Sequence, residues 1–153
     1  SSDLAFGSIY FALRRLTQEG LAQTQGVEQS GNRPSRTIYA ITDAGDRRFI
    51  SLLREHWQSK SVNRELMRTC LIFMQELQPD EVLLYLRAKA TVLDGMIRHI
   101  DEVFCEVSAQ GAPWTARLVC SYDSATCTRS RDWLTALADD IEIGRITWTV
   151  PLQ

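Results

Sequence analysis

The chain has 153 residues, enough for one domain or for two small domains that share a core. Hydrophobic residues make up 44% and charged residues 24%, which is usual for a soluble globular protein and argues against disorder. The apolar runs are too short for a membrane-spanning helix, and the start Ser1-Ser2-Asp3-Leu4 has neither the basic nor the apolar stretch of a signal peptide.

The formal net charge is −2, but its distribution carries more information than its sum. Residues 1–57 hold seven arginines and no lysine against six carboxylates, whereas residues 58–153 hold ten basic and thirteen acidic residues. The amino-terminal part can therefore form a basic patch, although the slight excess does not require one.

Cysteine and histidine spacing excludes a recognisable zinc or redox motif, since there is no Cys-x-x-Cys pair and the two histidines stand apart. We expect no bound metal or cofactor, and free thiols that act as small buried hydrophobes in the cytoplasm. A redox-sensing role for Cys120 or Cys127 is the less favoured alternative. The cysteines are Cys70, Cys105, Cys120 and Cys127.

The first segment predicts a helix that ends at Gly20, where a left-handed C-cap is expected. Its apolar face carries Ile9, Ala12, Leu13 and Leu16 at helical spacing. The opposite face holds two adjacent aromatic residues, which a solvated face would not usually expose. This face comprises Tyr10, Phe11, Arg14, Arg15 and Gln18.

Residues 21–28 and 36–42 are rich in strand formers and flank a turn-forming cluster, so they predict a β-hairpin with Arg33 at its tip and Arg36 at the start of its second strand. Thr42 is placed to cap a helix that runs to about Trp57. The polar stretch 58–62 then suggests a boundary between a domain of residues 1–57 and one of residues 58–153.

The remaining sequence predicts helices. Residues 66–77 are apolar around more than half the circumference of a helix, so that helix should be largely buried. Pro79 suits the first turn of the next helix, and the stretch Gln110–Pro113 ends it. A last helix follows, with a kink or break expected in the Ser- and Thr-rich segment 121–131. The tail 146–150 alternates like a strand.

The helix after Pro79 carries an apolar heptad seam, with Lys89 among the polar residues around it. One small chain has difficulty burying this seam and its other apolar faces together, so we expect the seam to hold an obligate homodimer. The alternative is that the seam is a bundle face within one chain. The seam comprises Leu83, Leu86, Ala90, Leu93, Ile97, Ile100, Phe104 and Val107.

Helix, hairpin and helix in this order form the second half of a winged helix-turn-helix domain, so the expected fold class is mainly α, with a helical dimerisation domain after the wing. The polar face of the first helix would reach phosphates or base edges of double-stranded DNA through Ser8, Tyr10, Phe11, Arg14, Arg15 and Gln18. The wing would contact the adjacent backbone or minor groove through Arg33 and Arg36. The alternative for the arginine pair alone is a solvated helix face.

Two motifs resemble the PadR-like transcriptional regulators. Gly7-Ser8-Ile9-Tyr10-Phe11-Ala12-Leu13-Arg14-Arg15-Leu16, followed by Glu19-Gly20-Leu21, is similar to the family's G-[ST]-x-Y-x-x-L-x-x-L…G-L core. The segment 33–45 is similar to its R-P-x-R-x-x-Y-x-[LI]-T-x-A-G wing, and residues 65–107 resemble the helical domain of its longer members. The resemblance implies a cytoplasmic homodimer on operator DNA, usually a repressor released by a small aromatic or hydrophobic effector.

A domain of this kind has two further helices before the recognition helix, but here only Ser1 to Phe6 precede it. We therefore expect Ile9, Leu13 and Leu16 to lack part of their packing partner. Aromatic residues in the second half are more often core than ligand site, so no effector residues are named.

No catalytic set emerges: neither histidine lies in a nucleophile or metal motif, and no Gly-x-Ser-x-Gly surrounds Ser8. The expected function is therefore DNA binding rather than catalysis. The rival function is a helical oligomerisation or protein-docking module that has lost DNA binding.

Overall fold

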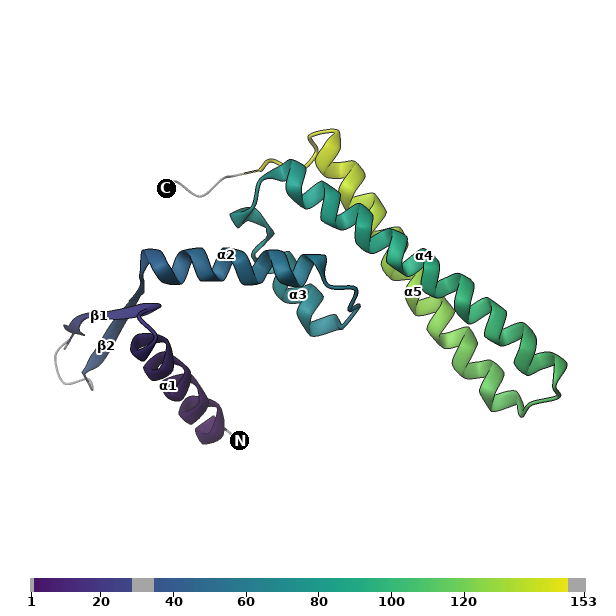
Figure 1. Cartoon of the computed structure of the whole chain (residues 1–153), viewed down its shortest axis with the longest axis horizontal. Helices are drawn as coiled ribbons and strands as arrows, with labels where there is room; N and C mark the ends of the chain where they lie inside the picture. Colours follow the sequence, from purple (N-terminus) through teal and green to yellow (C-terminus); the bar gives the residue numbers. More distant parts are fainter. Residues whose placement is uncertain (1, 29–34, 149–153) are drawn as a thin grey trace. The chain divides into compact units, whose positions relative to one another are not determined.

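The computed structural model describes the backbone of residues 2–28 and 35–148, and the side chains of this set from Gly7 onward. It is mainly helical with one β-hairpin, which confirms the expected fold class (Figure 1). The elements are α1 (Ser2–Gln18), β1 (Ala22–Glu28), β2 (Arg36–Ile41), α2 (Asp43–Gln58), α3 (Arg64–Ile72), the 3₁₀ turn η1 (Met74–Glu76), α4 (Pro79–Ala109) and α5 (Trp114–Glu142).

The chain divides into two compact units, Ser1–Arg54 and Glu55–Gln153, and each is described by itself below. Helix α2 contributes to both. The division of labour expected from the sequence, with DNA binding in residues 1–57 and dimerisation in residues 58–153, stays a prediction.

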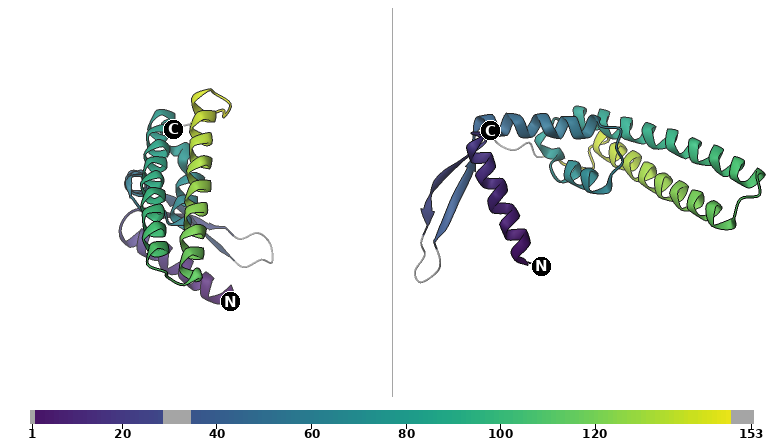
Figure 2. Two further views of the ribbon diagram at one scale, coloured as in Figure 1. Left: turned by 90° about the vertical axis from the view of Figure 1, so that its right-hand side faces the viewer. Right: turned by 60° about the horizontal axis from the view of Figure 1, so that its bottom comes forward.

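In the first unit, Gly20 ends α1 as predicted. Its φ of 72° is left-handed backbone that glycine adopts without strain, and the Leu21 amide donates to the carbonyl of Leu16 at 2.8 Å. The chain then turns into an antiparallel hairpin, paired from Ala22 opposite Ile41 to Glu28 opposite Arg36, with an irregularity between Thr24 and Gly26 (Figure 2). The predicted hairpin is therefore confirmed. Arg33 lies outside the described residues.

A compact junction joins α1, the hairpin and α2. The Thr42 hydroxyl donates to the Gly20 carbonyl at 2.7 Å and accepts the Gly45 amide at 3.1 Å, so Thr42 is the N-cap that the sequence predicts. The Thr42 amide donates to the Leu21 carbonyl at 3.1 Å. Gly45 is needed here because a Cβ at this position would lie 2.0 Å from the Leu21 carbonyl oxygen.

The second unit is built on α4 and α5, which run antiparallel as a helical hairpin across the short connection at Gly111 (Figure 2). Val82 and Leu86 of α4 are fully buried, and Leu134 and Ala138 of α5 are 2% and 1% exposed. The indole of Trp57, from the end of α2, is 1% exposed and stacks on Tyr85 with ring centroids 5.9 Å apart. Apolar burial of these side chains is the main term that stabilises the unit.

The sequence analysis placed Lys89 among the polar residues outside the seam, and the structure corrects this. Its side chain is 3% exposed, and its ammonium group donates to the carbonyls of Ser59 and Ser61. These bonds compensate for taking the charge out of water, and they fasten the linker between α2 and α3 to α4. Burial lowers the pKa of Lys89 and raises that of the neighbouring Cys70 thiol.

Helix α5 is continuous, so the break predicted in residues 121–131 is wrong. Two hydroxyls in this segment bond back to carbonyls one turn earlier: Thr126 donates to Tyr122 at 2.9 Å, and Ser130 donates to Thr126 at 2.9 Å. These two hydroxyls therefore find acceptors inside the helix without interrupting it.

Helix α3 is shorter and more exposed than predicted. It ends at Ile72, and the chain then turns through Phe73 into η1. Ile72 is 63% exposed and Phe73 38%, whereas Cys70 and Leu77 are buried. The expectation of a largely buried helix over residues 66–77 is therefore wrong, because neighbouring elements cover only one side of it.

Two smaller expectations are also corrected. Residues 146–148 form no strand; instead, the Trp148 indole donates to the Leu77 carbonyl at 3.2 Å, and residues 149–150 lie outside the described part. All four cysteines are free, but only Cys70 and Cys127 are buried. Cys105 is exposed and Cys120 partly so, so the expectation of four buried thiols is wrong.

Candidate nucleic-acid interface

The outward face of α1 presents the residues that the sequence assigns to DNA. Tyr10 is 65% exposed and Phe11 71%, and Ser8, Arg14 and Gln18 are exposed as well. Their spacing places them along one side of a single helix, because residues three and four apart share a helix face. This surface joins aromatic bodies with cationic and amide donors, the groups that contact phosphates, sugars and base edges.

The two arginines of this face differ. The Arg15 guanidinium donates to the Glu19 carboxylate at 2.8 Å, and this bond raises the pKa of Arg15. Arg14 makes no hydrogen bond or ion pair with any residue of the described part. Glu19 was missed as a site residue, although its spacing of four from Arg15 is the usual one for a helical ion pair. Among the described residues, Arg14 is therefore the cation of this face that is available to a phosphate.

The opposite face of α1 is incompletely covered. Ile9 is 55% exposed and Leu16 39%, and the expectation that this face lacks part of its packing is confirmed. Leu13 and Leu16 line a hollow of about 340 Å³ that the hairpin and α2 close on the other sides, with Tyr39 and Phe49 among its walls.

The wing supplies the second part of the candidate interface. Arg36 begins β2, is exposed, and pairs in register with Glu28 across the hairpin. The structure therefore places Arg36 in the same unit as the α1 face, on a separate element.

The seam expected to join two copies is partly used inside one chain. Leu86 and Leu93 are 0% and 3% exposed in the single chain, so they have no surface left for a second copy. The prediction that these two residues form the dimer interface is therefore corrected. Phe104 is 38% exposed. The other seam residues, which are Leu83, Ala90, Ile97, Ile100 and Val107, are partly buried, and their role in a dimer stays a prediction.

The expectation that the aromatic residues of the second half belong to the core is wrong for the outer side of α5. Trp114, Leu118 and Tyr122 follow one another at a spacing of four and are 65%, 56% and 71% exposed, and Trp133 is 52% exposed. Since eleven residues are close to three full turns, Trp133 continues the stripe of Tyr122. The regular spacing of these large side chains could have revealed the stripe from the sequence.

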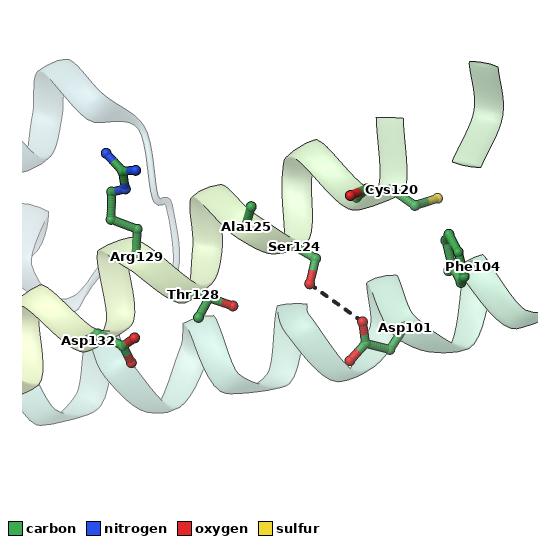
Figure 3. Close-up of a pocket in the computed structure, with 9 residues that line it drawn as sticks. Asp101, Phe104, Cys120, Ser124, Ala125, Thr128, Arg129 and Asp132 are labelled. Carbon is green, nitrogen blue, oxygen red and sulfur yellow. Dashed lines mark hydrogen bonds between the residues drawn. The ribbon is translucent and has the colours of Figure 1, made fainter. Parts of the chain in front are cut away.

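A polar hollow of about 690 Å³ lies between α4 and α5. Its walls include Asp101, Phe104, Cys120 and Thr128, and the Ser124 hydroxyl donates to Asp101 across it at 3.5 Å (Figure 3). In the described part of the chain, no three histidine, cysteine or carboxylate side chains gather as a metal site would need, and no helix is long and apolar enough to cross a membrane.

Comparison with protein families supports the resemblance seen in the sequence. Residues 2–51 match the family described as "Transcriptional regulator PadR-like family". The chain thus carries a PadR-like segment at its amino-terminal end, which includes α1, the hairpin and the first half of α2. No curated protein matches the chain.

Two solved structures are similar to the chain. The first is smu.1604c from Streptococcus mutans UA159, with 27% identity over 84% of this chain and 75% of that one, at a TM-score of 0.43. The second is Bacillus subtilis PadR in complex with operator DNA, with 18% identity over 88% of this chain and 77% of that one, at a TM-score of 0.45.

Proposed function

We propose that this protein is a sequence-specific DNA-binding transcriptional regulator that acts in the cytoplasm. The observation that carries the proposal is the exposed α1 face, where Tyr10, Phe11, Arg14 and Gln18 stand clear of the rest of their unit within a segment that matches the PadR-like regulators. In this proposal α1 enters the major groove, and the β1–β2 wing contacts the flanking backbone through Arg33 and Arg36.

Arg15 is paired with Glu19 whereas Arg14 has no partner among the described residues, and this difference provides a test. Arg14→Ala should weaken binding to the gene's own upstream DNA and lower the salt dependence by about one counterion. Arg15→Ala should cost less, because Arg15 must first give up Glu19. Conversely, Glu19→Gln should tighten binding, since it frees Arg15 and removes a carboxylate from the phosphates.

The assay is fluorescence anisotropy of labelled DNA at several salt concentrations. Arg117→Ala is the matched control, because Arg117 is an exposed arginine of α5, in the other unit. Equal losses in Arg14→Ala and Arg117→Ala would exclude α1 as the reading element. No binding at low salt would favour the rival function, an oligomerisation or docking module.

We further propose that the protein binds its operator as a homodimer and represses until a small aromatic or hydrophobic effector releases it. The part of the α5 stripe formed by Trp114, Leu118 and Tyr122 supports a dimer, because an exposed row of large apolar side chains is typical of an interaction surface. Part of the α4 seam, including Ile97 and Phe104, would extend this surface.

Leu118→Asp with Tyr122→Asp should give folded monomers, since both side chains are more than half exposed in the single chain. Leu93→Asp, by contrast, should unfold the α4–α5 hairpin, because Leu93 is 3% exposed. Sedimentation velocity together with circular dichroism separates these outcomes. A double variant that still sediments as a dimer would place the interface elsewhere.

A further inference from the structure

The second unit contains a groove between α3, α4 and α5 that no part of the proposed DNA-binding function uses. Its volume is about 390 Å³, within the range of small-molecule sites. The floor is apolar and buried, formed by Leu93 at 3%, Leu134 at 2% and Cys127 at 9% exposure. Burial raises the pKa of the Cys127 thiol, so the floor stays uncharged at neutral pH.

The walls combine apolar side chains with arginines. Met67 and Leu71 of α3 face the groove from one side and Trp133 of α5 from the other, and Trp133 is 52% exposed. An indole that is half exposed at the rim of a groove can stack on a planar group without first having to leave a packed core.

Charge is the most specific feature of this groove. Arg64, Arg68 and Arg129 line it, and no carboxylate of the described residues is among the lining side chains. This is notable because residues 58–153 hold more acidic than basic side chains, thirteen against ten. A groove that gathers only cations in an acidic unit is selective for anions.

The three guanidinium groups are also weakly engaged. Within the described part of the chain, Arg64 and Arg129 form no ion pair, and Arg68 lies 3.8 Å from Glu65. Figure 3 shows the Arg129 side chain pointing away from α4; Arg129 also borders the polar hollow that contains Asp101, but it forms no ion pair there with a described residue. By comparison, the nearby Arg131 is bonded to Asp94 at 3.0 Å and to Asp132 at 2.7 Å.

We propose that this groove binds a small organic anion, with its carboxylate or sulfonate on Arg64, Arg68 and Arg129 and its apolar body against Trp133, Leu71 and the floor. Guanidinium groups suit this role because their planar donors match the two oxygens of such an acid group. The inference deepens the proposed function, since it gives the effector a place and a charge, but binding at the groove requires no DNA.

The test uses 1-anilinonaphthalene-8-sulfonate, a fluorescent sulfonate with an apolar body, and the uncharged N-phenyl-1-naphthylamine, which has the same rings. The full chain should bind the sulfonate at one site per chain and the uncharged compound at least tenfold more weakly. Energy transfer from tryptophan should accompany binding, and Trp133→Phe should reduce it.

Arg64→Gln with Arg129→Gln should weaken sulfonate binding by about tenfold or more, the scale of a lost charge-assisted hydrogen bond, and leave the uncharged compound unaffected. Both arginines are exposed, so the variant should keep its fold, which circular dichroism checks. Arg117→Gln, on the same helix but outside the groove, is the control and should bind like the unchanged chain. Equal affinity for the two compounds, or full sulfonate binding by the double variant, would overturn the proposal.

The same sulfonate added to the DNA anisotropy assay separates the two proposals. Arginine-dependent binding with DNA affinity unchanged would support the groove and refute only its link to regulation. Absence of DNA binding together with arginine-dependent binding would refute the proposed function and leave the groove in place.

Discussion

Gly45→Ala tests whether the junction below the wing holds the first unit together. A Cβ built on Gly45 would lie 2.0 Å from the Leu21 carbonyl oxygen, 2.9 Å from the Leu21 carbonyl carbon and 2.8 Å from Cγ1 of Ile41. Real Cβ contacts stay above 3.0 Å, so the methyl group and the Leu21 backbone must separate by about 1 Å. Since two of the three atoms are backbone, no side-chain rotation relieves the clash.

The cost follows from what the Leu21 backbone holds. Its carbonyl accepts the Thr42 amide at 3.1 Å, and its amide donates to Leu16 at 2.8 Å. Overpacking of this kind costs about 1–3 kcal/mol, and loss of one of these bonds adds about 1 kcal/mol. Against this, alanine in a helix gains ~0.5–1 kcal/mol over glycine. The net expectation is a destabilisation of about 1–3 kcal/mol, each kcal/mol lowering the melting temperature by roughly 4–8 °C.

Gly7→Ala is the matched control, because Gly7 is also helical, lies in the same unit, and would meet no atom within 4 Å of its new Cβ. It should stabilise the unit by ~0.5–1 kcal/mol. The assay is thermal unfolding together with hydrogen exchange of the β1–β2 amides, which report on the first unit alone. The reasoning is refuted if Gly45→Ala matches the unchanged chain in melting temperature and in hairpin protection.

Three further changes probe the second unit and the cap. Thr42→Val should destabilise the first unit by about 1 kcal/mol in urea titrations, because the α2 N-cap is lost; an unchanged midpoint would contradict this. As pH rises above 9.0, unfolded chains release the Cys70 proton while the folded thiol, whose pKa is raised, keeps it, so stability falls; Cys70→Ala should remove this loss. Lys89 acts oppositely, because its lowered pKa makes the folded state release a proton that the unfolded state still holds, so stability rises with pH. Urea midpoints of Lys89→Met should therefore fall more steeply with alkaline pH than those of the unchanged chain, and a shallower fall would show that Lys89 is not desolvated.

The local rules of the chain were sufficient for the first unit. The end of α1 at Gly20, the two strands and the Thr42 cap each depend on residues within one turn or one hairpin, so the sequence alone predicts them. The exposed face of α1 is equally a matter of helical spacing. The same reasoning placed Pro79 correctly in the first turn of α4.

Only the tertiary structure decided which elements bury the apolar faces of the helices in the second unit. Heptad spacing shows that α4 has an apolar seam, but it does not say whether α5 or a second copy covers it, because both present the same kind of surface. Lys89 is buried because two backbone carbonyls of a distant linker meet it, and no pattern within α4 encodes that meeting. Helix α5 stays intact through its Ser- and Thr-rich segment because the Thr126 and Ser130 hydroxyls bond within the helix, while Cys127 and Leu134 are packed on its buried side. Local propensity is a matter of tenths of a kcal/mol per residue, and burial of a whole helix face outweighs it.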